Sequence, residues 1–381
     1  MNLTTNALAG KSYVPALDGF RGLAILIVVV SHYGFGKWIP GGFGVTLFFF
    51  ISGFLITRLL IAEHYKTQQI DLKGFYLRRV LRLYPALLMM VILAIGFSLS
   101  TGCGLQPGDI LSTLFYYRNY YMLYGVDASA FACGRMFNIT WSLAIEEHFY
   151  LFFPLLFIAL YRWPKVLGSV MFLGIIGALA WRIQLITTEG LNEITMFKTY
   201  HFTETRLDAI MYGCLVSLIL HHDRSERFLR LTISPVTLTI AVGMLLFTLL
   251  YRDDFFRETW RYSIQGVALS LILPAILYGK TYMSVKNWLS QPKLVLIGKF
   301  SYSLYLFHWV GVVVAERLVG GERLTATWLL TAVPLGLVLS VISYYGVEKP
   351  TARLRKRFGS TVETAPGLPE AHLSTKPTAL R

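Results

Sequence analysis

Charged side chains are scarce in this sequence. They make up 15% of the 381 residues, whereas hydrophobic residues make up 55% and the mean hydropathy is +0.56. A soluble protein of this length normally carries more charge on its surface. The scarcity therefore argues against a soluble protein and favours an integral membrane protein whose long apolar runs span the bilayer as helices.

Several signatures of soluble enzymes are also missing. The chain has three cysteines and no Cys-x-x-Cys spacing, which excludes the usual metal and redox motifs. It has no Gly-rich phosphate loop, no Gly-x-Ser-x-Gly elbow and no zinc-ligand spacing. The run His221–His222–Asp223 resembles a metal cluster but lies in a short basic loop, so we treat it as solvated and expect no bound metal.

Ten apolar runs predict the fold class: an all-α, polytopic membrane helical bundle with about ten transmembrane helices. The first run contains Arg21 and has no small-residue cleavage site, so we expect it to remain as a span. We divide the chain into a lead (1–12), a membrane domain (13–350) and a basic, then disordered tail (351–381). The expected spans lie near 13–33, 45–60, 83–101, 138–160, 166–183, 205–220, 231–251, 262–279, 300–318 and 326–346.

The net charge of +14 indicates orientation rather than nucleic-acid binding, because loops facing the cytoplasm are enriched in Lys and Arg. With a cytoplasmic N-terminus, the cytoplasmic segments hold 24 of the 35 Lys and Arg residues and the remaining segments hold 11. This bias predicts that both termini are cytoplasmic and that the protein contacts an anionic lipid bilayer. The longest outer segment (102–137) contains Cys103 and Cys133, which an oxidising compartment would allow to pair, although their spacing alone does not bring them together.

The first span carries three polar residues on one helix face. Asp18, Arg21 and His32 follow helical spacing, and the eleven positions between Arg21 and His32 correspond to roughly 16 Å along the axis. Arg21 could snorkel to the interface and His32 could simply hydrogen-bond within the bundle. Their shared face instead favours a functional line, in which histidine suits the abstraction of a hydroxyl proton.

The sequence FYLRRVLRLYPALL brings three arginines to the cytoplasmic end of the third span. Arg78 and Arg82 share one helix face, and so do Arg79 and Arg82. An ordinary positively charged flank is one explanation. Paired guanidinium hydrogen bonds to phosphate oxygens are the other, and they would suit an anionic ligand.

The sequence NITWSLAIEEHFYLFFPLL places two adjacent carboxylates in a membrane helix. Acidic residues near a helix start favour the helix dipole, but Glu146 and Glu147 lie beyond the first turn. Ser142 shares a face with Glu146. Adjacent residues point about 100° apart, so we expect only one carboxylate to face the bundle centre, where it could pair with an arginine or orient a histidine.

Two further polar groups have either a structural or an acceptor-binding interpretation. Arg206 and Asp208 begin the sixth span, where they could form an interfacial pair or line a pocket for a hydroxylated acceptor. His308 lies within the Ser- and Tyr-rich sequence FSYSLYLFH, where it could be a buried, hydrogen-bonded histidine or a residue that positions a ligand.

The order of these motifs resembles the membrane acyltransferase-3 family, of the bacterial O-antigen and exopolysaccharide O-acetylase type. The matching stretches run from residue 17 to residue 350 and are LDGFRGLAILIVVVSH, FFFISGFLIT, FYLRRVLRLYPAL, TWSLAIEEHFYLFFPLL, RLDAIMYGCL, FSYSLYLFH and YYGVEKP. The family pattern matches Arg21 and His32, the basic pair Arg79 and Arg82, and Glu146. Many members carry a C-terminal esterase-like domain that this sequence does not contain, so we expect the membrane part to carry any chemistry.

The resemblance implies an enzyme of a bacterial inner membrane that transfers an acyl group, usually acetyl from acetyl-CoA, to a hydroxyl of an extracytoplasmic glycan or glycolipid, as in lipopolysaccharide or exopolysaccharide modification. It would bind acyl-CoA as donor substrate and no resident cofactor. On this hypothesis Arg21, Arg78, Arg79 and Arg82 bind the donor, and His32 is the catalytic base, with Glu146 and Glu147 also catalytic. Direct transfer and an acyl-histidine intermediate both remain open.

A transporter of anionic or acylated molecules is the alternative. Ten spans with intramembrane charges and a basic cytoplasmic mouth would also suit an exporter, although the internal pseudo-symmetry typical of transporters is missing from the sequence. The sequence does not identify the acceptor, the acyl chain or the oligomeric state.

Overall fold

The computed structural model describes residues 13–125, 132–221, 225–320, 323–356 and 358 of the 381-residue chain. These residues form helices and no strands, which confirms the predicted all-α class. The lead (1–12), most of the tail, and His222 and Asp223 of the suspected metal cluster lie outside the described residues.

A helix occupies each of the ten predicted places. These long helices are α1 (Pro15–His32), α2 (Gly41–Thr67), α3 (Leu72–Thr101), α6 (Trp141–Leu160), α7 (Pro164–Glu189), α9 (Thr203–Leu220), α11 (Pro235–Leu250), α13 (Trp260–Tyr278), α15 (Pro292–Leu318) and α16 (Ala326–Ser343). The shorter elements are η2 (Phe35–Lys37), α4 (Pro107–Leu114), α5 (Arg118–Tyr124), η3 (Ala132–Thr140), α8 (Glu193–His201), α10 (Ser225–Thr232), α12 (Asp254–Glu258), η4 (Lys280–Tyr282), α14 (Met283–Leu289), the π-helix η5 (Tyr344–Glu348) and α17 (Lys349–Lys356).

Within the described residues, seven helices are long and apolar enough to cross a membrane, and an eighth span results if α10 and α11, bent by 70°, count as one. The seven are α1, α2, α3, the segment Cys133–Leu160, α7, α13 and the segment Ala326–Arg355. The helices α9 and α15 stand where two further spans were predicted, but both carry several polar residues. The count of ten and the orientation stay predictions.

Local sequence signals explain where many helices begin. Proline occupies the first position of α1, α4, α7, α11 and α15, where its missing N–H costs no hydrogen bond. Asp71 caps α3 by accepting a hydrogen bond from the Gly74 N–H at 2.9 Å, and α3 ends at Gly102 with a φ of 64°, a value that suits glycine. The starts of α1, α7 and α11 lie within a few residues of the predicted apolar runs, whereas α3 and α15 begin 11 and 8 residues before theirs.

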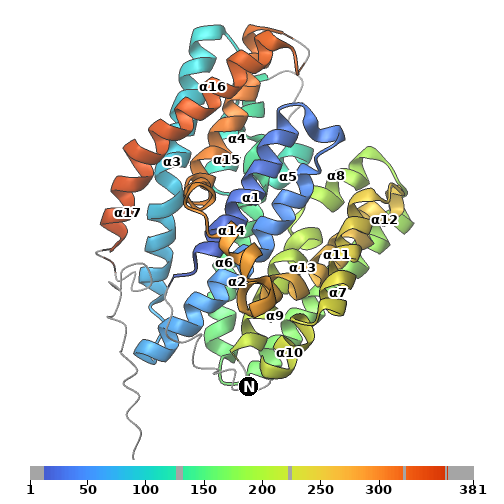
Figure 1. The fold of residues 1–381 in the computed structure, drawn as a ribbon. Coiled ribbons are helices and arrows are strands. Elements are labelled where there is room, and N and C mark those ends of the chain that lie inside the picture. The colour runs from blue at the N-terminus through green and yellow to red at the C-terminus, as the bar shows by residue number, and fades with distance from the viewer. Residues whose placement is uncertain (1–12, 126–131, 222–224, 321–322, 357, 359–381) are drawn as a thin grey trace, which may run out of the picture.

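The bundle is organised around close contacts of α1 with α15 and of α2 with α9 (Figure 1). A Cβ on Gly22 would lie 2.5 Å from the Leu294 carbonyl oxygen of α15, and one on Gly298 would lie 1.8 Å from the Asp18 carbonyl oxygen of α1. The second pair of helices shows the same arrangement through Gly53 and Gly213. Glycine therefore lets these backbones approach, and this contact holds the polar residues of α1 against those of α15.

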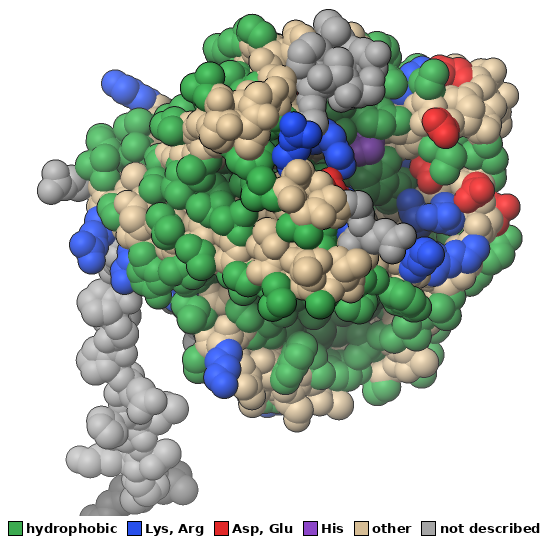
Figure 2. All heavy atoms as spheres, turned by 90° about the horizontal axis from the view of Figure 1, so that it is seen from above, with side chains coloured by type: hydrophobic (Ala, Val, Ile, Leu, Met, Phe, Trp, Pro, Cys, Tyr) green, Lys and Arg blue, Asp and Glu red, His purple; other side chains and the backbone are tan. Residues whose placement is uncertain are grey.

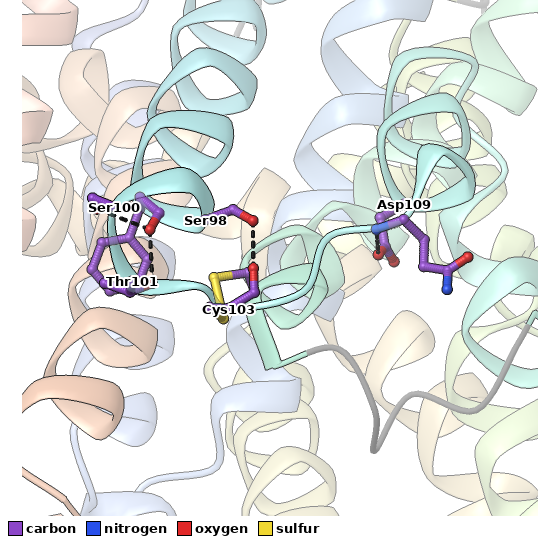
Figure 3. Close-up of a disulfide and its surroundings, with 8 residues drawn as sticks. Ser98, Ser100, Thr101, Cys103 and Asp109 are labelled. Carbon is purple, nitrogen blue, oxygen red and sulfur yellow. Dashed lines mark hydrogen bonds between the residues drawn. A yellow bond between two sulfur atoms is a disulfide. The ribbon is translucent and has the colours of Figure 1, made fainter.

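The polar residues of α1 define two ends of the bundle, which we call the Arg21 end and the His32 end. At the His32 end a disulfide joins Cys103, in the loop after α3, to Cys133 in η3, with a Cα–Cα distance of 5.6 Å (Figure 3). Ser98 donates a hydrogen bond to the Cys103 carbonyl and anchors the same loop to α3. The structure thus decides the pairing that the sequence left open.

Candidate active site

His32, the last residue of α1, contacts His308 in the middle of α15. The His32 Nδ1 and the His308 Nε2 lie 2.9 Å apart, and the two rings are nearly parallel with an interplanar angle of 3°. His308 is fully buried, with an exposed fraction of 0%, whereas His32 is partly exposed. His308 is therefore a buried, hydrogen-bonded histidine, as one of its two interpretations expects, and His32 is one of its partners. That it positions a ligand stays a prediction.

A backbone carbonyl fixes the protons of this pair. The His308 Nδ1 lies 2.8 Å from the Leu304 carbonyl oxygen, which can only accept, so the His308 Nδ1–H donates to it. In a neutral His308 the Nε2 is then an acceptor, and the His32 Nδ1–H donates to it. The proton arrangement leaves the His32 Nε2 with a lone pair, which is the state that a base or a nucleophile requires.

Aromatic and charged groups surround the partly exposed side of His32. The Trp309 ring lies 4.9 Å from the His32 ring between centroids, and the Arg323 Nη1 donates to the His32 carbonyl oxygen at 3.1 Å. Viewed onto the His32 end, the surface is hollowed, with a histidine side chain inside the hollow and basic side chains beside it (Figure 2). Neither Trp309 nor Arg323 was predicted from the sequence, since no local pattern links them to α1.

Arg21 and Asp18 lie together at the other end of α1, as their spacing predicted. The Arg21 Nη1 lies 3.3 Å from the Asp18 Oδ1, and the Arg21 Nη2 donates to the Ser301 Oγ of α15 at 2.9 Å. Asp18 also accepts a hydrogen bond from the Tyr13 hydroxyl at 2.8 Å. Together with the His32–His308 pair, the Arg21–Ser301 contact shows that the polar face of α1 lies against α15 along its length.

Glu146 and Glu147 each have a polar partner, on two different helices. Glu146 accepts a hydrogen bond from the Ser52 hydroxyl of α2 at 2.8 Å, and the Glu147 Oε1 lies 3.9 Å from the Arg79 Nη1 of α3. Neighbouring helices thus supply partners about 100° apart on α6. That only one carboxylate faces the bundle centre stays a prediction. Arg79 also stacks on the Tyr150 ring, with its guanidinium carbon 3.3 Å from the ring centroid.

The three arginines of α3 have different surroundings. Arg78 donates to Glu63 at 3.1 Å and to the Phe358 carbonyl at 3.2 Å. Arg82 is exposed and, within the described residues, has no hydrogen-bond or ion-pair partner, although it lies within electrostatic range of Glu146 and Arg21. Arg79 and Arg82 thus adjoin the carboxylates, whereas Arg78 ties α3 to α2 and to the C-terminal segment.

Glu348 is a partly buried acid that was not predicted from the sequence. It closes the π-helix η5 and accepts a hydrogen bond from the Ser303 hydroxyl, which also bonds the Ser343 hydroxyl at 2.8 Å. Arg82 and Arg21 lie within electrostatic range of it. The available signal was the matching stretch YYGVEKP, which contains this glutamate.

Three residues that were predicted to be structural or to line an acceptor pocket contact other protein groups: Ser142, Arg206 and Asp208. Ser142 bonds the Tyr305 hydroxyl at 2.5 Å, and that hydroxyl donates to the Ile139 carbonyl at 2.9 Å. Asp208 pairs at 2.8 Å with Arg182 of α7, and both side chains are fully buried. The structure places Asp208 with Arg182 rather than with Arg206.

Arg206 is fully buried without an acidic partner among the described residues. Its Nη2 donates to the Thr46 Oγ1 at 3.0 Å, and its guanidinium carbon lies 3.9 Å from the Tyr262 ring centroid. Aromatic faces stabilise a buried cation through their negative quadrupole. This arrangement joins α9 to α2 and α13 and is structural.

His201 of α8 lies outside the candidate spans. It stacks on the Phe197 ring at 4.1 Å and donates from Nδ1 to the Phe197 carbonyl at 3.0 Å. Burial among aromatic rings lowers the pKa of His201 to about 4, so it is neutral at neutral pH. These contacts with Phe197 give His201 a role in packing.

Comparison with known proteins agrees with this set of motifs. A family model described as an acyltransferase domain matches residues 14–345 of the chain. The chain belongs to the acyltransferase-3 family. The resemblance seen in the sequence is thereby confirmed over most of the chain.

Two relatives are proteins named O-acetyltransferase OatA, from Staphylococcus aureus strains NCTC 8325 / PS 47 and COL. Each is 32% identical to this family member over 355 residues, which cover 89% of this chain and 57% of the relative. The chain therefore spans little more than half the length of the curated relatives it matches. No solved structure matches the chain.

Proposed function

We propose that this protein transfers an acetyl group from acetyl-CoA to a hydroxyl of a glycan or glycolipid on the extracytoplasmic side of a bacterial inner membrane. The observation that carries the proposal is the His32–His308 pair, whose proton arrangement leaves the His32 Nε2 free to accept a proton. Family membership and the names of the relatives support acyl transfer as the reaction class.

The Arg21 end would receive the donor. Coenzyme A carries several phosphates, and the guanidinium groups of Arg21, Arg79 and Arg82 gather around Glu146 at this end. Arginine suits phosphate through paired, charge-assisted hydrogen bonds. Arg82 is the leading candidate because it is exposed and has no ion-pair partner among the described residues.

The pantetheine arm would then lie along the polar face of α1. Arg21 and His32 are roughly 16 Å apart along the helix axis, a distance that an extended arm spans. The hydroxyls of Ser301 and Ser52 lie on the flanking helices and offer hydrogen bonds to the amides of the arm. This path would bring the thioester to His32 from the Arg21 end.

The acceptor would approach from the His32 end. His32 Nε2 takes the proton of the acceptor hydroxyl as its oxygen attacks the thioester carbonyl carbon. The carbon–sulfur bond breaks, and the leaving thiolate takes the proton from His32, which restores the neutral histidine and releases coenzyme A. His308 stabilises the intermediate imidazolium through the bond to its Nδ1–H.

The disulfide supports this orientation. Disulfides persist in oxidising compartments such as the bacterial periplasm and are rare in the cytosol. Because Cys103 and Cys133 lie at the His32 end, that end faces outward on this proposal and the Arg21 end faces the cytoplasm, where acetyl-CoA is made.

The test is acetyl-CoA turnover by the purified protein. Release of the coenzyme A thiol in the presence of a glycan acceptor should disappear in His32→Ala and persist in His64→Ala, a histidine at the far end of α2. Transport of an anionic solute without thiol release would instead support an exporter. Mass analysis of glycans from cells with and without the gene would identify the acceptor.

A further inference from the structure

A pocket of about 210 Å³ lies at the His32 end, between the end of α3, η3 and the end of α15. Cys103, one half of the disulfide drawn in Figure 3, lines this pocket. Its lining residues are Phe97, Cys103, Arg135, Val313, Glu316 and Arg317. None of the pocket's charged residues belongs to the sequence motifs that led to the family.

The charge of this pocket is positive. The Glu316 Oε2 lies 3.1 Å from the Arg135 Nη2, and the Glu316 Oε1 accepts bonds from Arg323 at 2.7 and 3.0 Å. One carboxylate is thus shared by two guanidinium groups. Arg317 is exposed and has no hydrogen-bond or ion-pair partner among the described residues, so it adds a third positive charge to the cluster. Such an excess favours an anionic ligand with oxygen acceptors.

Two side chains, Arg323 and Trp309, each contact both the pocket wall and His32. Arg323, held by Glu316, donates to the His32 carbonyl at 3.1 Å. The Trp309 indole N–H donates to the Arg135 carbonyl at 2.8 Å, and its ring lies 4.9 Å from the His32 ring. The Arg135 backbone and the Glu316 carboxylate, both in the pocket wall, are therefore each separated from His32 by one side chain.

We propose that this pocket binds a carboxylate or phosphate group on the acceptor sugar, so that a hydroxyl of the same or the adjoining sugar meets His32. Arg317 and Arg135 would bind the anion, and Glu316 would hold Arg135 in place. The Trp309 ring would support the sugar between the anion site and His32. The inference rests on the proposed function in taking His32 as the place of transfer, and it adds that the acceptor is an anionic sugar.

A matched pair of probes tests the anion site directly. Methyl β-D-glucuronoside and methyl β-D-glucoside share their ring hydroxyls and differ in a carboxylate against a hydroxymethyl group. Affinities for the full-length protein in detergent are measured by saturation-transfer NMR titration. We expect the glucuronoside to bind roughly tenfold tighter or more, as one charge-assisted hydrogen-bond pair would give.

Variants assign that preference to the pocket. Arg317→Gln should abolish the preference while the fold is kept, because Arg317 holds no other described group. Arg252→Gln, at an exposed arginine between α11 and α12, is the control and should keep it. Equal affinity for the two probes, binding of neither, or a preference that survives Arg317→Gln would overturn the proposal.

The acetyl-transfer assay separates this proposal from the previous one. His32-dependent thiol release with no preference between the probes would leave acyl transfer standing and remove the anionic acceptor. A preference that depends on Arg317, without His32-dependent thiol release, would keep the anion site and remove acyl transfer.

Discussion

The His32 Nδ1 donates to the His308 Nε2 at 2.9 Å, and His308 in turn donates to the Leu304 carbonyl at 2.8 Å. The pair joins residues 276 positions apart in the chain. It gives His32 one tautomer and one ring orientation, and it provides a partner for the charge that His32 gains when it takes a proton.

Replacement of His308 tests this positioning role. His308→Asn should lower kcat for acetyl transfer by about 10- to 100-fold. General-base catalysis contributes a rate factor of roughly 10²–10⁴, and in this variant the base His32 remains and loses only the partner that orients its ring. The KM for acetyl-CoA should stay within about twofold because His308 lies far from the Arg21 end. A rise in KM with kcat unchanged would show that His308 binds substrate instead.

Arg82 and Arg78 form a matched pair for donor binding. Arg82→Gln should raise the KM for acetyl-CoA by about tenfold or more, as loss of a charge-assisted phosphate contact would. Arg78→Gln should raise it less, because Glu63 and the Phe358 carbonyl already engage that guanidinium. Steady-state kinetics at saturating acceptor decides between them, and a larger effect at Arg78 would contradict the assignment.

The Arg182–Asp208 pair predicts a stability effect. Asp208→Asn leaves the buried Arg182 guanidinium without a counter-charge, which should cost about 3–5 kcal/mol of unfolding free energy. A thermal-shift measurement in detergent should show a lower midpoint, and the KM for acetyl-CoA of the folded fraction should be unchanged. An unchanged midpoint together with a raised KM would assign Asp208 to the binding site.

The disulfide can be tested by peptide mapping and by its effect on the KM for the acceptor. Peptide mapping without reduction should recover Cys103 and Cys133 in one cross-linked species. The double variant Cys103→Ser/Cys133→Ser should raise the KM for the acceptor and leave that for acetyl-CoA unchanged, because the bond forms the pocket wall at the His32 end only. Separately alkylated cysteines in protein taken from cells would contradict the outward orientation of this end.

The sequence was sufficient to predict where the long helices lie and which residues of α1 share the face that forms the site. Apolar runs placed all ten long helices, and helical spacing put Asp18, Arg21 and His32 on one side of α1. These are local properties, set by about 3.6 residues per turn.

The contacts between distant helices could not be read from the sequence. His308 reaches His32 because α1 and α15 meet backbone to backbone at Gly22 and Gly298, and no single run of residues encodes that crossing. Glu348 was missed for a similar reason, since it lies at the end of a π-helix, whose altered period moves side chains off the α-helical face. The pocket at the His32 end also combines three separate segments.

The most direct test of the account is acetyl transfer by His32→Ala in purified, correctly folded protein. Transfer of label from acetyl-CoA to glycan should fall to background while the affinity for acetyl-CoA remains that of the wild type. Transfer at the wild-type rate in this variant would contradict the assignment of His32 as the reacting group.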